Sequence, residues 1–139
     1  LPFREIAWHI TKENIVAYTR ECAHQMRRLG FERPRLAVAA LNPHGGEHGL
    51  FGDEEMREIS PAVQELRNVF GLDVYGPIPA DSVYHLAKEG AYDAVISLYH
   101  DQGHIACKTL DFARTISLTL QLPFLQSACQ SQYRPPQSI

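Results

Sequence analysis

The uninterrupted apolar run Leu36-Ala37-Val38-Ala39-Ala40-Leu41 is the feature that most constrains the fold of this chain. It is too short for a typical helix, and it is bounded by Arg33-Pro34-Arg35 before it and by the polar, glycine-rich segment 42–52 after it. A half-exposed strand would alternate apolar and polar residues, whereas this run is apolar throughout. We therefore predict a central strand that is covered on both faces of a sheet.

Further strands and helices alternate along the chain. Thr11 is suited to an N-cap, and Gly30 ends this first predicted helix, whose apolar residues recur at helical spacing: Ile15, Tyr18, Cys22, Met26 and Leu29. The other predicted strands are 73–78, 94–98 and 115–120, and the other predicted helices are 54–69, restarted by Ser60-Pro61, and 81–89, capped by Asp81. This alternation predicts an α/β fold with an open, mainly parallel sheet and helices on both faces.

Composition limits the classes of partner. With 139 residues, 45% of them hydrophobic, the chain can bury one modest core. Its net charge of −3 and the lack of a long basic run argue against nucleic-acid and membrane-surface partners. No stretch approaches the roughly 20 apolar residues of a membrane helix, and no signal peptide is evident, so we expect a cytoplasmic protein with a small-molecule ligand. The three cysteines are widely separated and suggest neither a disulfide framework nor a thiolate zinc site.

Two histidine-containing loops follow predicted strands, where open α/β sheets bind ligands. The first reads Asn42-Pro43-His44-Gly45-Gly46-Glu47, and the second reads Tyr99-His100-Asp101-Gln102-Gly103. Two imidazoles from separate strand ends, one beside a carboxylate, could bind a divalent cation, although two ligands do not complete a site. The alternative is that each histidine only hydrogen-bonds its own loop.

Three charged residues are further candidates. Lys108 could bind a phosphate or carboxylate, or it could be an ordinary surface lysine. Asp81 and Asp101 could act as general bases, but Asp81 is explained equally well as a helix N-cap. Asp101, which adjoins His100, has the stronger case.

Three ordered motifs give the chain a family resemblance. They are Asn42-Pro43-His44-Gly45-Gly46-Glu47 through Phe51-Gly52, Gly76-Pro77-Ile78-Pro79-Ala80-Asp81, and Tyr99-His100-Asp101-Gln102-Gly103. In this order, and joined by the segment 115–124, they resemble the signatures of the 4-hydroxythreonine-4-phosphate dehydrogenase family of pyridoxine biosynthesis. The resemblance covers residues 1–125, which we take as one catalytic, metal-binding α/β domain, and only part of the family's length.

The resemblance implies an isocitrate-dehydrogenase-like fold, a homodimer, and oxidation of a phosphorylated hydroxy acid with NAD and a divalent metal such as Zn, Mg or Co, followed by decarboxylation. It implies that His44 and His100 are metal ligands and that Lys108 contacts the substrate. It further implies that Asp81 and Asp101 are active-site carboxylates. It gives no residues for binding NAD.

The chain also departs from the family pattern. The family's third metal histidine would stand immediately before Leu1, its substrate asparagine is Ser117 here, and its substrate arginine is Gln126, which offers no charged fork to phosphate. His104 resembles the branch of the family that acts on phosphoerythronate or phosphothreonate. These departures leave open a catalytically inactive, truncated remnant or a binding module of the same fold.

The tail 126–139 matches nothing in the family pattern. A one-base shift of the reading frame near Gln126 would restore a family-like sequence, so we hypothesise a frameshift in this atypical tail.

Overall fold

The computed structural model describes residues 1–119 and, in backbone only, residues 126–129. These residues form two compact units, residues 1–103 and the part that starts at His104, and each is described by itself. The sheet and most of the helices belong to the first unit.

A three-stranded parallel sheet forms the centre of the first unit. Its strands are β1 (Leu36–Ala39), β2 (Val74–Ile78) and β3 (Ala94–Ile96), in the order β2-β1-β3. All four residues of β1 are fully buried. The prediction of a central strand covered on both faces is therefore confirmed.

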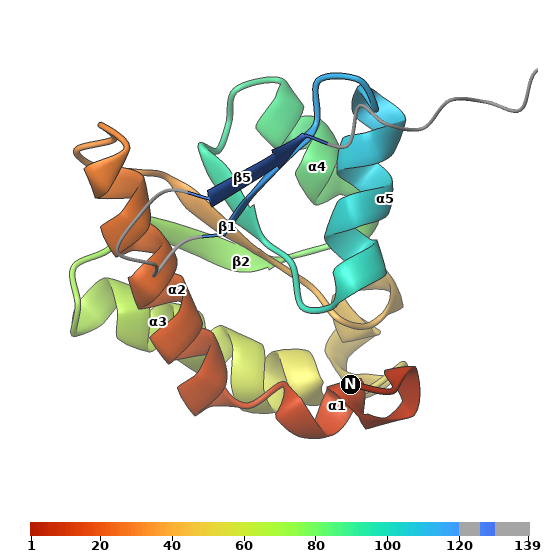
Figure 1. Cartoon of the computed structure of the whole chain (residues 1–139). Coiled ribbons are helices and arrows are strands. Elements are labelled where there is room, and N and C mark those ends of the chain that lie inside the picture. Colours follow the sequence, from red (N-terminus) through yellow and green to blue (C-terminus); the bar gives the residue numbers. More distant parts are fainter. Residues whose placement is uncertain (120–125, 130–139) are drawn as a thin grey trace, which may run out of the picture. The chain divides into compact units, whose positions relative to one another are not determined.

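Helices cover both faces of this sheet (Figure 1). On one face, α2 (Lys12–Arg28) packs beside α3 (Ser60–Asn68), which contacts β2. On the other face, α4 (Ala80–Lys88) packs against β1 and β3. Because β2 and β3 lie on opposite sides of β1, right-handed crossovers place α3 and α4 on opposite faces. The predicted α/β class, with a mainly parallel sheet between helical layers, is confirmed.

The core is divided by the sheet. Leu36 and Val38 of β1 face the α2–α3 layer, whereas Ala37 and Ala39 face α4 and its buried Val83. Alternate residues of one strand thus serve both layers, as the pleat of a strand requires. The larger cluster consists of Ile10, Ile15, Val16, Ala23, Leu36, Val38, Ile59, Ala62, Val63, Leu66, Val74 and Ile96.

The first long helix begins as its sequence predicts. The Thr11 side chain accepts a hydrogen bond from the backbone N–H of Asn14, so Thr11 is the N-cap of α2. The buried face of α2 differs from the predicted one, because it runs through Ile15, Thr19 and Ala23 while Tyr18 is 68% exposed. The apolar residues of α2 cover more than one face, and tertiary packing selects between them.

Two predicted caps are wrong. The residue that caps α4 is Pro79, and Asp81 lies inside the first turn, where its Oδ1 accepts a hydrogen bond from Ser82. Ser60 continues a helical backbone, because α3 follows directly from a π-helical turn, η3 (Glu55–Ile59). A side-chain cap needs an extended backbone at the cap residue, and neither position has one.

The remaining elements are short or belong to the second unit. The first unit also contains the 3-10 turns η1 (Phe3–Glu5) and η2 (Pro43–Gly49) and the short helix α1 (Ile6–His9). Helix α5 (His100–Leu110) starts in the first unit and ends in the second. Within the described residues, no helix is long and apolar enough to cross a membrane.

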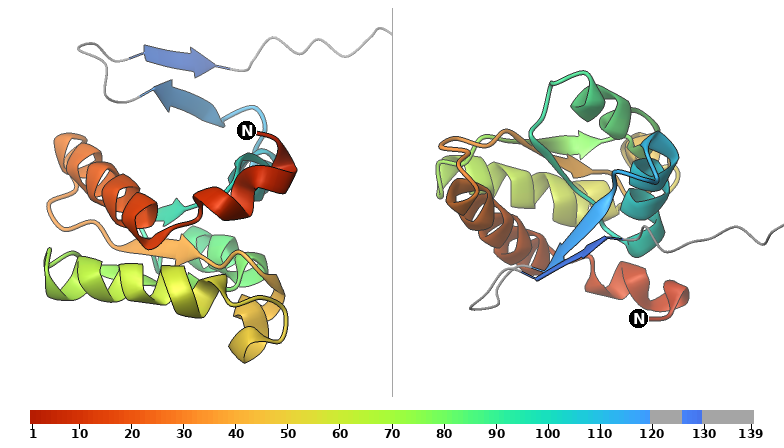
Figure 2. Two further views of the ribbon diagram at one scale, coloured as in Figure 1. Left: turned by 90° about the horizontal axis from the view of Figure 1, so that it is seen from below. Right: turned by 45° about the horizontal axis from the view of Figure 1, so that its top comes forward.

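The second unit contains a two-stranded antiparallel sheet (Figure 2). Strand β4 (Ile116–Thr119) pairs with β5 (Gln126–Cys129), with Ser117 opposite Ala128 and Thr119 opposite Gln126. The strand expected at 115–120 exists, but its partner is the start of the tail and not the parallel sheet. A short apolar run predicts a strand without predicting its partner. The proposed boundary at residue 125 and the frameshift stay predictions, and residues 130–139 lie outside the described residues.

Candidate functional site

The two histidine loops start from adjacent strands. Residue 42 follows β1 and residue 97 follows β3, and these strands are parallel neighbours. The chain after β1 continues to α3 on one face. After β3 it continues to α5, whose Gly103 lies against Ser97 and the hydroxyl of Tyr84 on α4. This divergence is the topological switch point at which open α/β sheets bind ligands.

The loop after β1 has an unusual backbone. Five consecutive residues from His44 to His48 have positive φ, including 54° at His44 and 44° at Glu47. Such left-handed conformations are strained for residues with a Cβ atom, and strain of this kind often accompanies functional sites. The His44 side chain is exposed, and its ring centroid lies 6.2 Å from that of Phe51.

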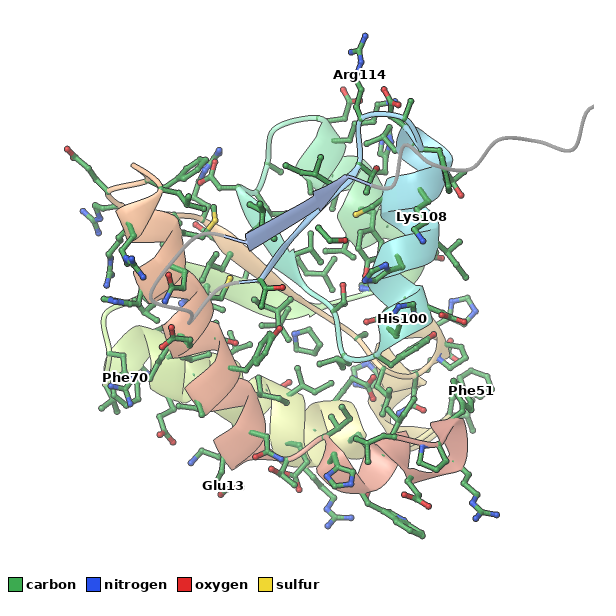
Figure 3. The ribbon with its side chains drawn as sticks, in the orientation of Figure 1. Glu13, Phe51, Phe70, His100, Lys108 and Arg114 are labelled. Atoms are coloured by element: carbon green, nitrogen blue, oxygen red, sulfur yellow. The ribbon has the colours of Figure 1, made fainter. Side chains whose placement is uncertain are left out.

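The first turn of α5, a segment that the sequence predicts as a loop, places an imidazole beside a carboxylate just after β3. His100 Nδ1 lies 2.8 Å from Asp101 Oδ1, and both side chains are more than two-thirds exposed. If Nδ1 carries the proton that it shares with Asp101, Nε2 presents a lone pair to a ligand. Figure 3 shows His100 and Phe51 at the same end of the first unit and Phe70 at the other end.

A buried carboxylate holds the start of the first loop. Glu55 is only 3% exposed, and its Oε1 accepts hydrogen bonds from the backbone N–H groups of Leu41 and Asn42, at 2.8 and 2.7 Å. Its Oε2 accepts a third from the Asn42 side chain. Gly46 completes the packing, because a Cβ atom there would lie 2.8 Å from Glu55 Oε2 and from the carbonyl oxygen of Gly52.

A buried amide joins the ends of β1 and β3. Gln102, which is 8% exposed, donates from Nε2 to the carbonyl oxygen of Ala40 at 2.8 Å. Its Oε1 accepts the backbone N–H of Leu98, also at 2.8 Å. The Gln102 side chain therefore satisfies one backbone group beyond each strand and ties the start of α5 to both.

The other predicted site residues lie as follows. Asp81 is exposed at the start of α4, after β2, so the parallel topology places it at the same sheet edge as the two histidine loops. Lys108 belongs to the second unit, with its Nζ 5.9 Å from the centroid of the Phe112 ring. Ser117 is partly buried in β4, and Gln126 begins β5.

The described residues offer an incomplete metal-ligand set. Among them, no group of three or more His, Cys, Asp or Glu side chains could hold a metal ion. Exposed imidazoles are suitable donors for a divalent cation, and the contact of His100 with Asp101 is the kind that orients a metal ligand. The donor chemistry fits a divalent cation, but the number of donors requires a ligand from elsewhere.

Comparison with known proteins decides the family. The family described as "Pyridoxal phosphate biosynthetic protein PdxA" matches residues 1–130. The chain belongs to the PdxA family. It is 59% identical, over 119 residues, to a protein of Symbiobacterium thermophilum provisionally named D-threonate 4-phosphate dehydrogenase, and 56% identical to one of the same name from Fusobacterium nucleatum. Both matches cover 86% of this chain and 35% of the relative, so the chain spans about a third of these relatives' length.

Solved structures agree with this membership. The 4-hydroxythreonine-4-phosphate dehydrogenase of Klebsiella pneumoniae superposes with a TM-score of 0.86 at 42% identity, covering 94% of this chain and 39% of that one. A 4-hydroxythreonine-4-phosphate dehydrogenase of Burkholderia phymatum gives a TM-score of 0.84 at 35% identity, covering 93% and 39%. The resemblance inferred from the three motifs is confirmed, as is a partial version of the family fold.

Two residues of this PdxA site were missed by sequence reasoning. Glu55 lies on the same helical stripe as Ile59, Ala62 and Leu66, so an acidic residue in an apolar stripe was an available signal. Gln102 gives no such signal, because the sequence predicts segment 99–103 as a loop, whereas Gln102 lies in the first turn of α5.

Proposed function

We propose that this chain forms the metal- and substrate-binding part of an NAD-linked dehydrogenase that oxidises a phosphorylated hydroxy acid. The observation that carries the proposal is the placement of the His44 loop and the His100–Asp101 pair at adjacent strand ends of a PdxA fold. Relatives and structural neighbours that are named as dehydrogenases support it.

Each predicted residue receives a role in this proposal. His44 and His100 bind a divalent cation, Zn, Mg or Co, and Asp101 orients the His100 ring through Nδ1. A divalent cation would supply the Lewis acidity that favours ionisation of a substrate hydroxyl group. Asp81 and Asp101 are the proposed bases for the hydroxyl proton. The proposed substrate contacts are Lys108, Ser117 and Gln126.

The proposed reaction consists of a hydride transfer followed by a decarboxylation. Oxidation of the hydroxyl carbon transfers a hydride to NAD, and the resulting keto acid then loses its carboxylate as carbon dioxide. No residue of this chain is assigned to NAD.

D-Threonate 4-phosphate is the proposed substrate. The relatives that carry this substrate in their names are 54–59% identical to the chain, whereas the structural neighbours named for 4-hydroxythreonine 4-phosphate are 35–42% identical. His104 is exposed, and this residue is the one that resembles the branch of the family acting on phosphorylated sugar acids. 4-Hydroxythreonine 4-phosphate and phosphoerythronate are the alternative substrates for assays.

Completion of the site requires further groups. A third metal ligand and the NAD surface would come from the rest of a longer protein or from the partner subunit of a homodimer, the assembly that the family resemblance implies. We propose a cytoplasmic location for this assembly, as for other enzymes of small-molecule metabolism.

A non-catalytic binding module or inactive remnant is the second candidate. It is favoured by Gln126, which stands where the resemblance implies an arginine, and by the lack of a three-ligand group among the described residues. Such a module would keep the fold and lose both metal binding and turnover.

Calorimetric titration of the metal-stripped chain with zinc distinguishes the two candidates. The first candidate gives saturable binding that both His44→Ala and His100→Ala abolish, while His24→Ala, which removes an exposed imidazole from α2, binds as the unmodified chain does. Equal binding by all variants contradicts the proposed metal site, because the bound zinc would then depend on neither His44 nor His100. Absence of saturable binding by the unmodified chain favours the module. Assays with NAD and D-threonate 4-phosphate follow only a positive result.

A further inference from the structure

One peptide group at the end of β1 is held at both ends by buried side chains. The carbonyl oxygen of Ala40 accepts from Gln102 Nε2, and the N–H of Leu41, which belongs to the same peptide group, donates to Glu55 Oε1. From this arrangement we infer that Gln102 and Glu55 are positioning residues, which fix the His44 loop and the His100 helix start relative to each other. The inference rests on the proposed function in one respect only: the geometry that these two residues fix is taken to be that of a metal site.

Glutamine is specifically suited to position 102. Its amide must donate to the carbonyl of Ala40 and accept from the N–H of Leu98 at the same time. A carboxylate could not donate, and a lysine could not accept. Gln102 is also two residues from His100 and adjacent to Asp101, so the two bonds of its side chain restrain the helix start that carries the imidazole–carboxylate pair.

Glutamate is equally suited to position 55. Its hydrogen-bond partners, the backbone of Leu41 and both the backbone and the side chain of Asn42, are all N–H donors, and an ionised carboxylate is an acceptor-only group that makes strong bonds with such donors. One of these donors is the backbone of Asn42, two residues before His44. The bonds therefore fix the direction in which the chain enters the left-handed turn that presents His44.

The two side chains together form a continuous link between the candidate ligands. It runs from Leu98 through Gln102 to the Ala40–Leu41 peptide group, and then through Glu55 to Asn42. Neither Gln102 nor Glu55 needs to touch a metal ion to affect its binding. Residues that hold metal ligands in place typically change metal affinity by about 10- to 100-fold when they are replaced.

The test replaces Gln102 with methionine, which has a similar length and no amide. Two controls accompany it. Gln64→Met makes the same chemical change at an exposed position of α3, and Val63→Ala destabilises the buried face of α3 without touching the link. The readout is the pair of ring ¹H–¹³C NMR signals of His44 and His100 in the metal-free chain. This readout does not depend on metal binding or on enzymatic activity.

We expect Gln102→Met to shift the ring signals of both histidines, and the two controls to leave both unchanged. A shift of His100 alone, with His44 unchanged, would overturn the inference, because the link through the shared peptide group would then transmit nothing. If Gln102→Met does not fold, Gln102→Glu serves instead: it keeps the acceptor for Leu98 and removes the donor to Ala40, so the His44 signals should still shift, and their constancy would again overturn the inference.

Zinc titration of the same variants separates this inference from the proposed function. If the unmodified chain binds zinc, Gln102→Met should weaken binding about tenfold while Val63→Ala does not; equal weakening by both variants would reduce Gln102 to a purely structural residue. If the unmodified chain binds no zinc, the binding module is favoured over the dehydrogenase, and the ring signals alone decide whether Gln102 positions the two histidines.

Discussion

His100 Nδ1 and Asp101 Oδ1 lie 2.8 Å apart, although the two residues are adjacent in sequence and both side chains are largely exposed. An exposed pair of this kind contributes little to folding stability. Its effect should instead appear in the orientation of the imidazole and in the basicity of the nitrogen that faces a ligand.

Replacement of Asp101 by asparagine tests this role. The amide oxygen can still accept a hydrogen bond, but the negative charge is lost, so we expect zinc affinity to fall about tenfold with an unchanged free energy of unfolding. Calorimetry and urea unfolding measure the two quantities, and Glu13→Gln on α2 is the control for loss of an exposed carboxylate. If Asp101→Asn binds zinc as tightly as the unmodified chain does, the contact between His100 and Asp101 plays no part in metal binding.

Two adjacent glycines provide a matched pair for the His44 loop. Both have left-handed φ values, 66° at Gly45 and 80° at Gly46, but a Cβ atom meets nothing at Gly45 and meets Glu55 and the Gly52 carbonyl at Gly46. Gly46→Ala should therefore destabilise the chain by about 1–3 kcal/mol more than Gly45→Ala, since overpacking adds to the common backbone strain. Urea unfolding provides the measurement. Equal destabilisation would show that Gly46 is not closely packed against Glu55.

Arg35 and Asp93 close the opposite end of the sheet. Hydrogen bonds from the Arg35 guanidinium, and then from its backbone N–H, hold the pKa of the Asp93 carboxyl below its ordinary value of 3.8. A lowered pKa in the folded state means that the pair stabilises the fold above the ordinary value, and that this stabilisation is lost as the pH falls through the lower folded-state value.

Asp93→Asn should therefore be less stable than the unmodified chain at pH 7, and the difference should shrink as the pH is lowered below about 3.8. Urea unfolding of both proteins across this pH range measures the difference, with Glu13→Gln as the control. A difference that stays constant down to pH 2.5 would contradict a role for the ionised Asp93 carboxylate.

Two cysteines should differ in reactivity. Burial raises the pKa of the Cys22 thiol, so less thiolate forms there at pH 8, whereas Cys107 is exposed. In a Cys129→Ser background, iodoacetamide should modify Cys107 at least about tenfold faster than Cys22 in the folded chain, and the two rates should converge in urea. Mass spectrometry of the labelled peptides gives both rates. Equal rates in the folded chain would show that the α2 layer does not protect Cys22.

The sequence predicted the parallel sheet because its signals are local. A fully apolar run such as 36–41 has few alternatives to a buried strand, and Thr11 can cap a helix with contacts that lie within three residues. The position of β4 was also predicted, but not its antiparallel pairing with β5, because strand partners depend on contacts that no single segment encodes.

The sequence names the candidate ligands of the site, which stay predictions, but it does not identify the residues that hold them in place. His44 and His100 follow strand ends and belong to recognisable motifs, so they could be named from the sequence. Glu55 and Gln102 act through burial and through hydrogen bonds to backbone groups, one of which lies 62 residues away in the chain. The residue type of Asp81 permits either an N-cap or an active-site carboxylate, and the structure excludes the cap because the N-cap residue of α4 is Pro79.

A zinc titration that follows both ring NMR signals tests most directly whether His44 and His100 bind the same divalent cation. We expect the signals of His44 and His100 to change together, with one midpoint and one zinc ion bound per chain, while the signals of His24 on α2 stay constant. Separate midpoints for the two rings, or a response of only one of them, would contradict a shared metal site at the ends of β1 and β3.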